Sequence, residues 1–218
     1  MKVKLDMHVH TRYSDGLNSP EEVIREALKR GLQGVSITDH NVIEGSLEAV
    51  KIGRKLGAIV VPGVEVRSRG GDILAYGVYE NIKPKLSVME TLDAIREAGG
   101  IAVAAHPYSR FVRRLSLGDL VRRYPFDGIE VFNSRARIED NNKAAEVARE
   151  LGLPGTAGSD AHSIWEVGNA YIVVEANNSE EVIKAIKRGE VQVCGVKTSY
   201  AIMALTSVRK AFLMLQSI

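Results

Sequence analysis

The chain has 218 residues, and its 29 lysines and arginines nearly balance its 27 aspartates and glutamates, which leaves a net charge of +2. This length suits one domain with a substantial core, and the near-neutral charge excludes a broad basic surface for nucleic acid or anionic membranes. The single cysteine, Cys194, excludes a disulfide-stapled scaffold and favours a reducing, cytoplasmic location. No apolar stretch approaches the roughly 18 residues that a spanning helix needs, so we expect no membrane partner.

Short apolar runs rich in β-branched residues alternate along the chain with amphipathic stretches. Buried strands are expected at Lys2–Met7, Val35–Thr38, Ala58–Val61, Ile101–Ala105, Gly128–Phe132, Pro154–Ala157 and Ala170–Val174. Helices are expected at residues 19–30, 45–56, 87–98, 117–124, 140–151, 179–187 and 199–215. Ser19-Pro20-Glu21-Glu22 and Ser87-Val88-Met89-Glu90 both have the capping-box pattern that starts a helix.

The repeated strand–helix order predicts an α/β fold with parallel strands, in a single domain over residues 1–218. The order alone leaves open whether the sheet is a barrel or is doubly wound. One interruption is expected, because Ser68-Arg69-Gly70-Gly71 joins residues 64–67 to residues 72–76 as a hairpin after the third strand. The last stretch, residues 198–218, predicts an amphipathic helix packed on the rest of the domain. A dimer contact is the alternative for this helix, so monomer and homodimer both stay open.

All five histidines lie at the downstream end of an expected strand or in the loop that follows it. Acidic residues occupy equivalent places. The set comprises His8, His10, Asp15, His40, Glu65, His106, Asp160 and His162. Because the carboxyl ends of parallel strands meet at one face, we expect these side chains to converge.

The spacing of these residues favours a metal site. Residues i and i+2 of an extended segment point the same way, which aims His8 with His10, and Asp160 with His162, at common targets. Imidazole and carboxylate ligands suit zinc, manganese or iron, and so large a set favours two or three neighbouring divalent ions. A lone histidine at a strand end is more often a hydrogen-bonded or surface residue than a ligand. Taken singly, the two aspartates fit turns or helix N-caps and Glu65 fits a surface strand, so the whole set carries the prediction. Asp39, next to one of the histidines, is expected to orient its imidazole.

Short motifs carry these residues in a fixed order along the chain. They are His8-Val9-His10, Asp15, Thr38-Asp39-His40, Gly63-Val64-Glu65, Ala105-His106-Pro107 and Gly158-Ser159-Asp160-Ala161-His162. In these motifs the sequence resembles the PHP family, named for polymerase and histidinol phosphatase, whose known members are metal-dependent phosphoesterases. The resemblance implies a distorted (β/α)7 TIM-like barrel with up to three metal ions at the carboxyl ends of its strands.

The resemblance also implies how the ligands divide among the ions. One ion would sit on His8, His10, Glu65 and Asp160. A second would sit on Asp15, His40 and His162. The third would share Glu65 and take His106 plus a residue of the hairpin, where this sequence has Asp72 at a position that is histidine in many relatives.

A water held between two divalent ions becomes hydroxide near neutral pH, and the same ions offset charge on a phosphoryl group. The sequence therefore predicts a hydrolase acting on phosphoric ester bonds, in which a metal-bridging hydroxide cleaves a phosphate monoester of a small metabolite or nucleotide. The whole histidine and carboxylate set is assigned to catalysis. Arginine pairs well with phosphate, so Arg135 is the first candidate for gripping substrate, with Asn133 and Arg12 beside it and Arg67 and Arg110 behind.

Two other functions stay open at this point. One is a 3′–5′ or 5′–3′ exonuclease on short RNA or DNA, because near-neutral charge disfavours a long duplex but permits a short strand. The other is a non-catalytic, metal-stabilised interaction module. The complete set of candidate ligands favours an enzyme over such a module.

Overall fold

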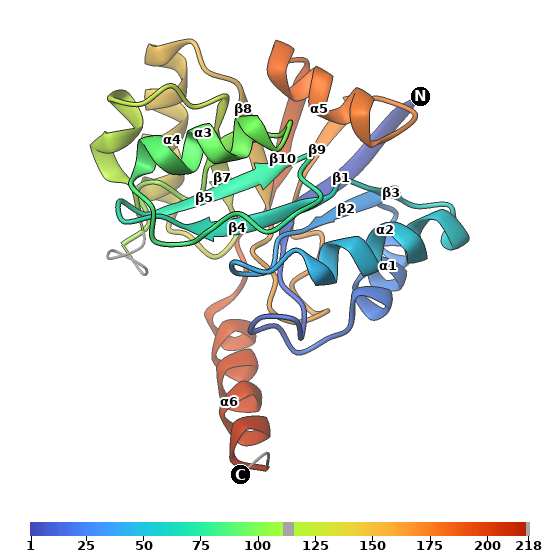
Figure 1. Ribbon diagram of the computed structural model, residues 1–218. Coiled ribbons are helices and arrows are strands. Elements are labelled where there is room, and N and C mark those ends of the chain that lie inside the picture. Colours follow the sequence, from blue (N-terminus) through green and yellow to red (C-terminus); the bar gives the residue numbers. More distant parts are fainter. Residues whose placement is uncertain (111–115, 217–218) are drawn as a thin grey trace.

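The computed structural model describes residues 1–110 and 116–216, and Figure 1 shows its ribbon. The strands are β1 Lys2–Val9, β2 Gly34–Ile37, β3 Ile59–Val60, β4 Gly63–Arg67, β5 Asp72–Tyr76, β6 Ile101–Ala104, β7 Gly128–Asn133, β8 Gly155–Gly158, β9 Ala170–Glu175 and β10 Val191–Gly195. The helices are α1 Pro20–Lys29, α2 Glu44–Leu56, α3 Val88–Glu97, α4 Ile138–Leu151, α5 Ser179–Arg188 and α6 Tyr200–Gln216, with a 3-10 helix η1 at Gly118–Arg122.

The strands expected from the sequence are all present, while β10 was not expected and the helix predicted at 117–124 is the short η1. Both capping boxes are confirmed. Ser19 and Ser87 each accept the backbone N–H of a glutamate at the third helical position, and Glu22 and Glu90 accept the N–H of the cap in return. The hairpin is also confirmed, because β4 pairs antiparallel with β5.

The described strands form two five-stranded sheets, in the orders β10-β9-β1-β2-β3 and β4-β5-β6-β7-β8. Strands β1, β2 and β3 run parallel, as do β6, β7 and β8. Strands β5, β9 and β10 run antiparallel to their neighbours. These antiparallel strands interrupt the parallel order, and the described residues form no closed barrel. The expected (β/α)7 barrel is thus corrected to a mixed α/β fold with two sheets.

Two isolated parallel bridges join the sheets where their strands end, between His40 and Glu65 and between Val9 and Ala161. Gly158 permits this close approach, since a Cβ atom at that position would lie 2.2 Å from the Cβ of His8. Any side chain there would push β8 away from β1. The strand ends of both sheets therefore meet at one rim of the molecule.

The core lies partly between the sheets and partly under the helices. Leu5 and Met7 of β1 pack with Leu74 and Tyr76 of β5, and all four are fully buried. The Tyr76 hydroxyl donates to the carbonyl oxygen of Met7 at 2.8 Å, which ties one sheet to the other. Helices α1 and α2 cover the first sheet, and α3 and α4 cover the second (Figure 1).

Helix α6 extends away from the rest of the molecule in Figure 1. Thr206 is buried and Lys210 is partly buried. The exposed fractions of its apolar side chains are 52% for Leu205, 67% for Val208 and 58% for Phe212. Ile202 and Met203 are half-buried, so this helix contacts the molecule through apolar and polar side chains, while several of the apolar residues that suggested packing face solvent. No helix in the described ranges is long and apolar enough to cross a membrane.

Candidate metal centre

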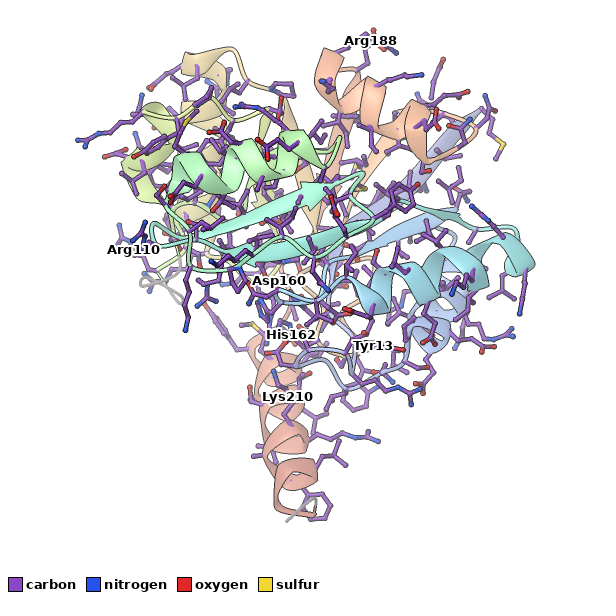
Figure 2. The ribbon with its side chains drawn as sticks, in the orientation of Figure 1. Tyr13, Arg110, Asp160, His162, Arg188 and Lys210 are labelled. Atoms are coloured by element: carbon purple, nitrogen blue, oxygen red, sulfur yellow. The ribbon has the colours of Figure 1, made fainter. Side chains whose placement is uncertain are left out.

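The predicted cluster forms at the rim where the two sheets meet. His8 lies in β1 and Glu65 in β4, and the other members lie in the loops after β1, β2, β6 and β8. The N–H of Asp160 donates to the His8 carbonyl at 2.8 Å, and the N–H of His10 donates to the Ala161 carbonyl at 2.8 Å. These bonds hold the loop after β8 against β1. Figure 2 shows Asp160 and His162 below the sheets, on the side from which α6 extends.

Two cluster members have backbones in the left-handed region that favours glycine. The φ angle is 26° at His106 and 54° at Asp160. Such conformations cost on the order of 1–3 kcal/mol and persist where surrounding contacts enforce them. Here the N–H of His106 donates to Glu130 at 2.8 Å, and the N–H of Asp160 is held by β1. The strain lies at the end of β6 and the end of β8, where both side chains turn into the cluster.

The cluster contains three overlapping groups whose ligand atoms lie within 4.8 Å of one another. The first is His8, His10 and Asp160, with 3.1 Å between the two Nε2 atoms and 3.2 Å from His10 Nε2 to Asp160 Oδ1. Glu65 Oε2 lies 3.4 Å from His10 Nε2. This agrees with the ligand set expected for one ion.

The second group is His10, Asp15, His40 and His162. Asp15 Oδ1 lies 3.2 Å from His162 Nε2 and 3.7 Å from His40 Nε2. The sequence placed the last three together, and the structure adds His10, whose ring centroid lies 4.4 Å from the ring centroids of both other histidines.

The third group is His8, Glu65 and His106. Glu65 Oε1 lies 3.0 Å from His106 Nε2, and Oε2 lies 3.5 Å from His8 Nε2 and 2.8 Å from His40 Nδ1. With His10 counted, one buried carboxylate thus faces four imidazoles with its two oxygens, as a ligand shared between ions does.

The donor set fits divalent metal ions. Asp15 Oδ1 and Glu65 Oε2 are buried, and their near neighbours are imidazole nitrogens. His162 Nε2 lies 3.2 Å from the first oxygen, and His40 Nδ1 lies 2.8 Å from the second. Imidazole nitrogens and carboxylate oxygens are the ligands that zinc, manganese and iron accept. Divalent ions at these groups would satisfy both oxygens.

The carboxyl groups of the cluster are poised to be ionised. Burial alone raises the pKa of a carboxyl group, but the surrounding imidazoles reverse this effect. The pKa values of Glu65 and Asp160 lie well below their ordinary range, and that of Asp15 is also lowered.

The imidazoles divide into two kinds. Burial, together with the charges of His162 and His40, lowers the pKa of His10 to about 3, so this ring is neutral. Burial also lowers the pKa of His40 and His106, but the charge and hydrogen bonds of Glu65 outweigh it and raise both to about 9. Without metal, these two rings hold a proton at neutral pH that an ion would displace.

Glu130 of β7 is a site residue that the sequence analysis missed. Its Oε1 accepts from His8 Nδ1 at 2.9 Å, and its Oε2 accepts from the N–H of His106 at 2.8 Å and from Asn133 Nδ2 at 3.1 Å. The signal was a glutamate inside the apolar run of β7, where a charge has no reason to be buried unless it has partners. Asn133, expected to bind substrate, also donates to Asp160 at 3.3 Å and so positions ligand residues.

Asp6 of β1 is a second missed residue. It is fully buried and accepts from the N–H of Ser159 at 2.9 Å and from the N–H of Gly168 at 2.7 Å. Burial outweighs these hydrogen bonds and raises its pKa to about 6. Asp6 thereby fixes the loop that carries Asp160 and His162.

Asp39 does not orient a histidine ring as the sequence suggested. Its carboxylate accepts from the N–H of Thr11 at 2.7 Å, from the Thr11 hydroxyl at 2.6 Å and from the Ser14 hydroxyl at 2.6 Å. The imidazole of His40 pairs instead with Glu65. Asp39 therefore shapes the loop that carries Asp15, because it accepts three hydrogen bonds from two residues of that loop.

Arg135 lies against the cluster, as the sequence predicted. Its Nη1 lies 2.6 Å from Nδ1 of His162, and its Nε lies 3.2 Å from Oε2 of the buried Glu166. Glu166 was not anticipated, and its other oxygen accepts from the Thr206 hydroxyl of α6 at 3.1 Å. Arg12 is exposed in the loop between β1 and α1.

Asp72 is buried but is paired with Arg67, whose Nη2 lies 3.2 Å from its Oδ2. Burial and the charge of Glu65 raise the pKa of Asp72 to about 6. It lies outside the three ligand groups of the described residues, so its expected part in holding a third ion stays a prediction. The hairpin supplies its own cation to this carboxylate.

Lys210 of α6 was also not anticipated at this site. Its Nζ lies 2.7 Å from Oδ2 of Asp15, the carboxylate whose other oxygen faces two histidines. Figure 2 shows Lys210 directly below His162. The last helix thus supplies a positive charge at the edge of the second ligand group.

A family model described as PHP-associated matches residues 139–191. Two uncharacterized proteins of Methanocaldococcus jannaschii are similar over longer spans. One is 37% identical over 162 residues, which are 68% of this chain and 94% of the relative. The other is 31% identical over 215 residues, which are 95% of this chain and 86% of the relative. The solved structure of a two-domain Bacteroides vulgatus protein containing a predicted PHP-like metal-dependent phosphoesterase matches with a TM-score of 0.76 at 18% identity, over 90% of this chain and 65% of that one. The chain belongs to the PHP family.

Shorter matches link this PHP protein to named activities. A phosphoribosyl 1,2-cyclic phosphate 1,2-diphosphodiesterase of Eggerthella lenta is 38% identical over 81 residues, which are 34% of this chain and 31% of the relative. A 5′-3′ exoribonuclease of Haemophilus influenzae is 29% identical over 107 residues, which are 47% of this chain and 39% of the relative. Both of these partial relatives are named for acting on phosphoric ester bonds.

Proposed function

We propose that this PHP protein hydrolyses a phosphate monoester of a small metabolite or nucleotide, with two or three divalent ions, zinc, manganese or iron, held by the histidine and carboxylate cluster. The observation that carries the proposal is the overlap of three ligand groups through His8 and His10, with the buried Glu65 facing members of all three groups. We infer further that residues 1–218 act as one PHP domain.

The residues that would hold the ions are those of the three groups. They are His8, His10, Asp15, His40, Glu65, His106, Asp160 and His162. Divalent ions bound there lower the pKa of water and offset charge on phosphoryl oxygens.

The chain's own groups orient this set and bind the substrate. Glu130 fixes the His8 ring through Nδ1, so that Nε2 faces the carboxylates. Arg135 is held by Glu166 at the edge of the cluster, where its remaining N–H groups are placed to pair with a phosphoryl oxygen. Arg12 is exposed at the same rim and is a weaker candidate for this role.

Two further candidates for function deserve separate tests. An exonuclease acting on short RNA or DNA is favoured by the partial similarity to the exoribonuclease. A non-catalytic metal-stabilised module is disfavoured by the complete ligand set, because a domain that no longer turns over has no need to keep every ligand.

The test is hydrolysis of p-nitrophenyl phosphate with added manganese, compared between the wild type and the double variant His8→Ala, His10→Ala. We expect measurable turnover in the first and a loss of about 100-fold or more in the second. The matched control is Arg188→Ala, which alters an exposed residue of α5 at the opposite end of the molecule (Figure 2). Equal, near-background rates in all three proteins would reject the enzyme hypothesis. Bis-p-nitrophenyl phosphate and a 5′-labelled oligonucleotide, assayed in parallel, separate monoesterase from nuclease.

A further inference from the structure

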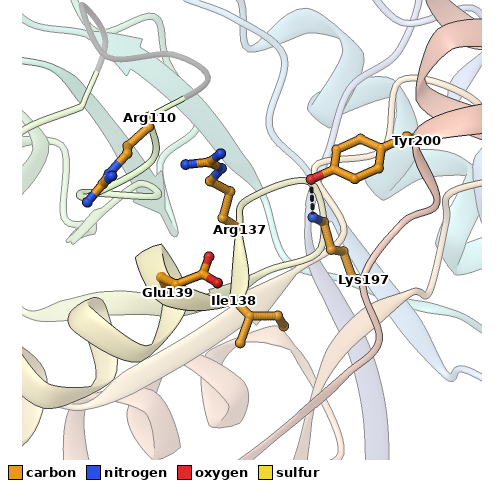
Figure 3. A pocket seen from close by; sticks show the side chains of 6 residues that line it. All are labelled: Arg110, Arg137, Ile138, Glu139, Lys197 and Tyr200. Carbon is orange, nitrogen blue, oxygen red and sulfur yellow. Dashed lines mark hydrogen bonds between the residues drawn. The ribbon is translucent and has the colours of Figure 1, made fainter.

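Two hollows in the surface meet at Tyr79. The first, called the α5 hollow, has a volume of about 340 Å³ and lies between the end of β5, the start of β6 and helix α5. The second, called the α2 hollow, has a volume of about 290 Å³ and lies between α2, β3 and the residues that begin α5. Tyr79 and Ser179 line both hollows. The hollow in Figure 3 is a different one, because it lies between the start of α4 and the segment that leads into α6.

These two hollows lie at the opposite end of the molecule from the metal centre. Strand β5 runs antiparallel to β6, so the end of β5 and the start of β6 lie at the same edge of their sheet. Ile101 at the start of β6 lines the α5 hollow, whereas the candidate ligand His106 follows the other end of that strand. Figure 2 shows Arg188, at the end of α5, on the far side of the sheets from Asp160 and His162. A ligand of the α5 hollow therefore occupies a site separate from the metal centre.

The α5 hollow combines an apolar floor with an aromatic side chain. Ile101 and Ile183 line it, and Gly77 permits the close approach of α5, since a Cβ atom there would lie 2.8 Å from Cδ1 of Ile183. The φ angle of 81° at this position also favours glycine. Tyr79 is 59% exposed, so its ring is open to a planar partner. Small-molecule pockets commonly have such apolar and aromatic walls with a few polar groups.

Exposed cations border both hollows. Lys184 and Lys187 of α5 line the first, and Arg54 of α2 lines the second. Within residues 1–110 and 116–216, none of these three side chains has a hydrogen bond or an ion pair. Glu180 is the single acid among the described residues that line the hollows. Three cations against one acid attract an anion.

We propose that the α5 hollow binds a nucleoside phosphate, with its base stacked on Tyr79 and its phosphate held by Lys184 and Lys187. Stacking on an aromatic side chain suits every base, because each base has a π face. Ammonium groups bind phosphate through charge-assisted hydrogen bonds. A volume of about 340 Å³ lies at the lower end of the range for small-molecule pockets and accommodates a nucleoside monophosphate. This binding site does not depend on the phosphoesterase function proposed above.

Calorimetric titration of the full chain with the four ribonucleoside 5′-monophosphates tests the proposal. The protein is treated with chelator, because metal removal prevents hydrolysis of the probe. We expect at least one nucleotide to bind with a Kd of about 100 μM or lower. The matching nucleoside and ribose 5-phosphate should each bind at least about tenfold more weakly, because each lacks one of the two interactions.

Three outcomes of this titration overturn the proposal. One is the absence of binding by all four nucleotides. The second is a nucleoside that binds as tightly as its nucleotide, which would indicate an aromatic pocket without a phosphate site. The third is ribose 5-phosphate binding as tightly as the nucleotide, which would indicate an anion site without stacking.

Variants locate the bound nucleotide. Tyr79→Ala and the double variant Lys184→Gln, Lys187→Gln should each weaken binding about tenfold or more, whereas Tyr79→Phe keeps the ring and should bind within about twofold of the wild type. Glu180→Gln should bind about two- to fivefold more tightly, because it removes the acid of the lining. Circular dichroism checks that each variant is folded. Binding that neither Tyr79→Ala nor the lysine double variant weakens contradicts the assignment to this hollow.

The matched control for the lysine variant is Arg188→Gln. It removes a cation of the same helix, but this arginine lies outside the described lining and pairs with Glu190 at 2.7 Å. We expect it to bind the nucleotide like the wild type. An equal loss of affinity in the control would mean that the overall charge of α5 attracts the anion, and would overturn the proposed contacts.

The double variant His8→Ala, His10→Ala distinguishes this site from the metal centre. We expect it to bind the nucleotide like the wild type, because the two sites lie at opposite ends of the molecule. Loss of binding in this folded variant would place the nucleotide at the metal centre, which would reject the α5 site and leave the proposed function standing. Nucleotide binding that depends on Tyr79, in a protein without phosphatase activity, would reject the proposed function and keep the α5 site.

Discussion

Substitution of Glu130 tests whether residues around the cluster orient its candidate metal ligands. Its Oε1 accepts from His8 Nδ1 at 2.9 Å, while its Oε2 accepts from both the N–H of His106 and Asn133 Nδ2, at 2.8 and 3.1 Å. In Glu130→Gln one oxygen becomes an NH2 group. In either orientation of the amide, the NH2 group faces at least one N–H donor that the carboxylate had accepted from, and that hydrogen bond is lost.

The expected result of Glu130→Gln is weaker metal binding. Burial alone lowers the pKa of His8, but Glu130, followed by Glu65 and Asp160, raises it well above its ordinary value, which shows how strongly the carboxylate acts on this ring. Loss of a partner that orients a metal-ligating histidine typically costs 10- to 100-fold in affinity, or about 1.4–2.7 kcal/mol.

The assay is competition for Zn²⁺ or Mn²⁺ against a chromogenic chelator, with circular dichroism to check folding. The matched control is Glu146→Gln, which removes a carboxylate from the exposed face of α4, where it pairs with Lys143 at 2.8 Å. We expect the control to bind metal like the wild type. A Kd for Glu130→Gln within about twofold of the wild-type value, in a folded protein, would refute the reasoning.

Three further expectations concern other parts of the site. In chelator-treated protein, His40 and His106 have pKa values of about 9, against about 6.5 in the unfolded chain. Their contribution to stability is therefore full below pH 6.5 and is lost as the pH rises to 9. The free energy of unfolding in urea should fall over this window, and a flat profile would contradict the expectation. Lys210→Met removes an ammonium group that lies 2.7 Å from Asp15. Because a competing positive charge is lost, divalent ions should bind about two- to fivefold more tightly in the chelator competition. Weaker binding would mean that the lysine supports the ion. Arg135→Lys keeps the charge but not the planar fork, and should lower kcat/KM for phosphate esters about tenfold, with unchanged kinetics counting against a substrate role.

The convergence of the ligands was predictable from the sequence even though the barrel was not. The i, i+2 pairs His8 with His10, and Asp160 with His162, are brought together by the ends of β1 and β8, which lie side by side through the bridge at Ala161. That argument needs only that strand ends share a rim. It holds for two sheets that meet there just as it holds for a closed barrel.

The partners that hold the cluster were less accessible to sequence reasoning. Glu130, Asp6 and Glu166 are buried, and their hydrogen-bond partners lie far away in the sequence. Asp6, for example, accepts from the N–H of Ser159, which is 153 residues away. A pattern of apolar and polar residues reports which face is buried but not which donor lies opposite. The antiparallel direction of β9 and β10 could not be predicted either, because hydrophobic periodicity does not distinguish parallel from antiparallel strands.

Helix α6 reaches the candidate metal centre through two polar side chains. Thr206 donates to Glu166, which pairs with Arg135, and Arg135 in turn contacts His162. One turn later, Lys210 pairs with the carboxylate of the second ligand group, while Leu205, Val208 and Phe212 are exposed. Because Lys210 and an ion at the second group would both be attracted to the charge of Asp15, we expect metal binding and the docking of α6 to be thermodynamically linked.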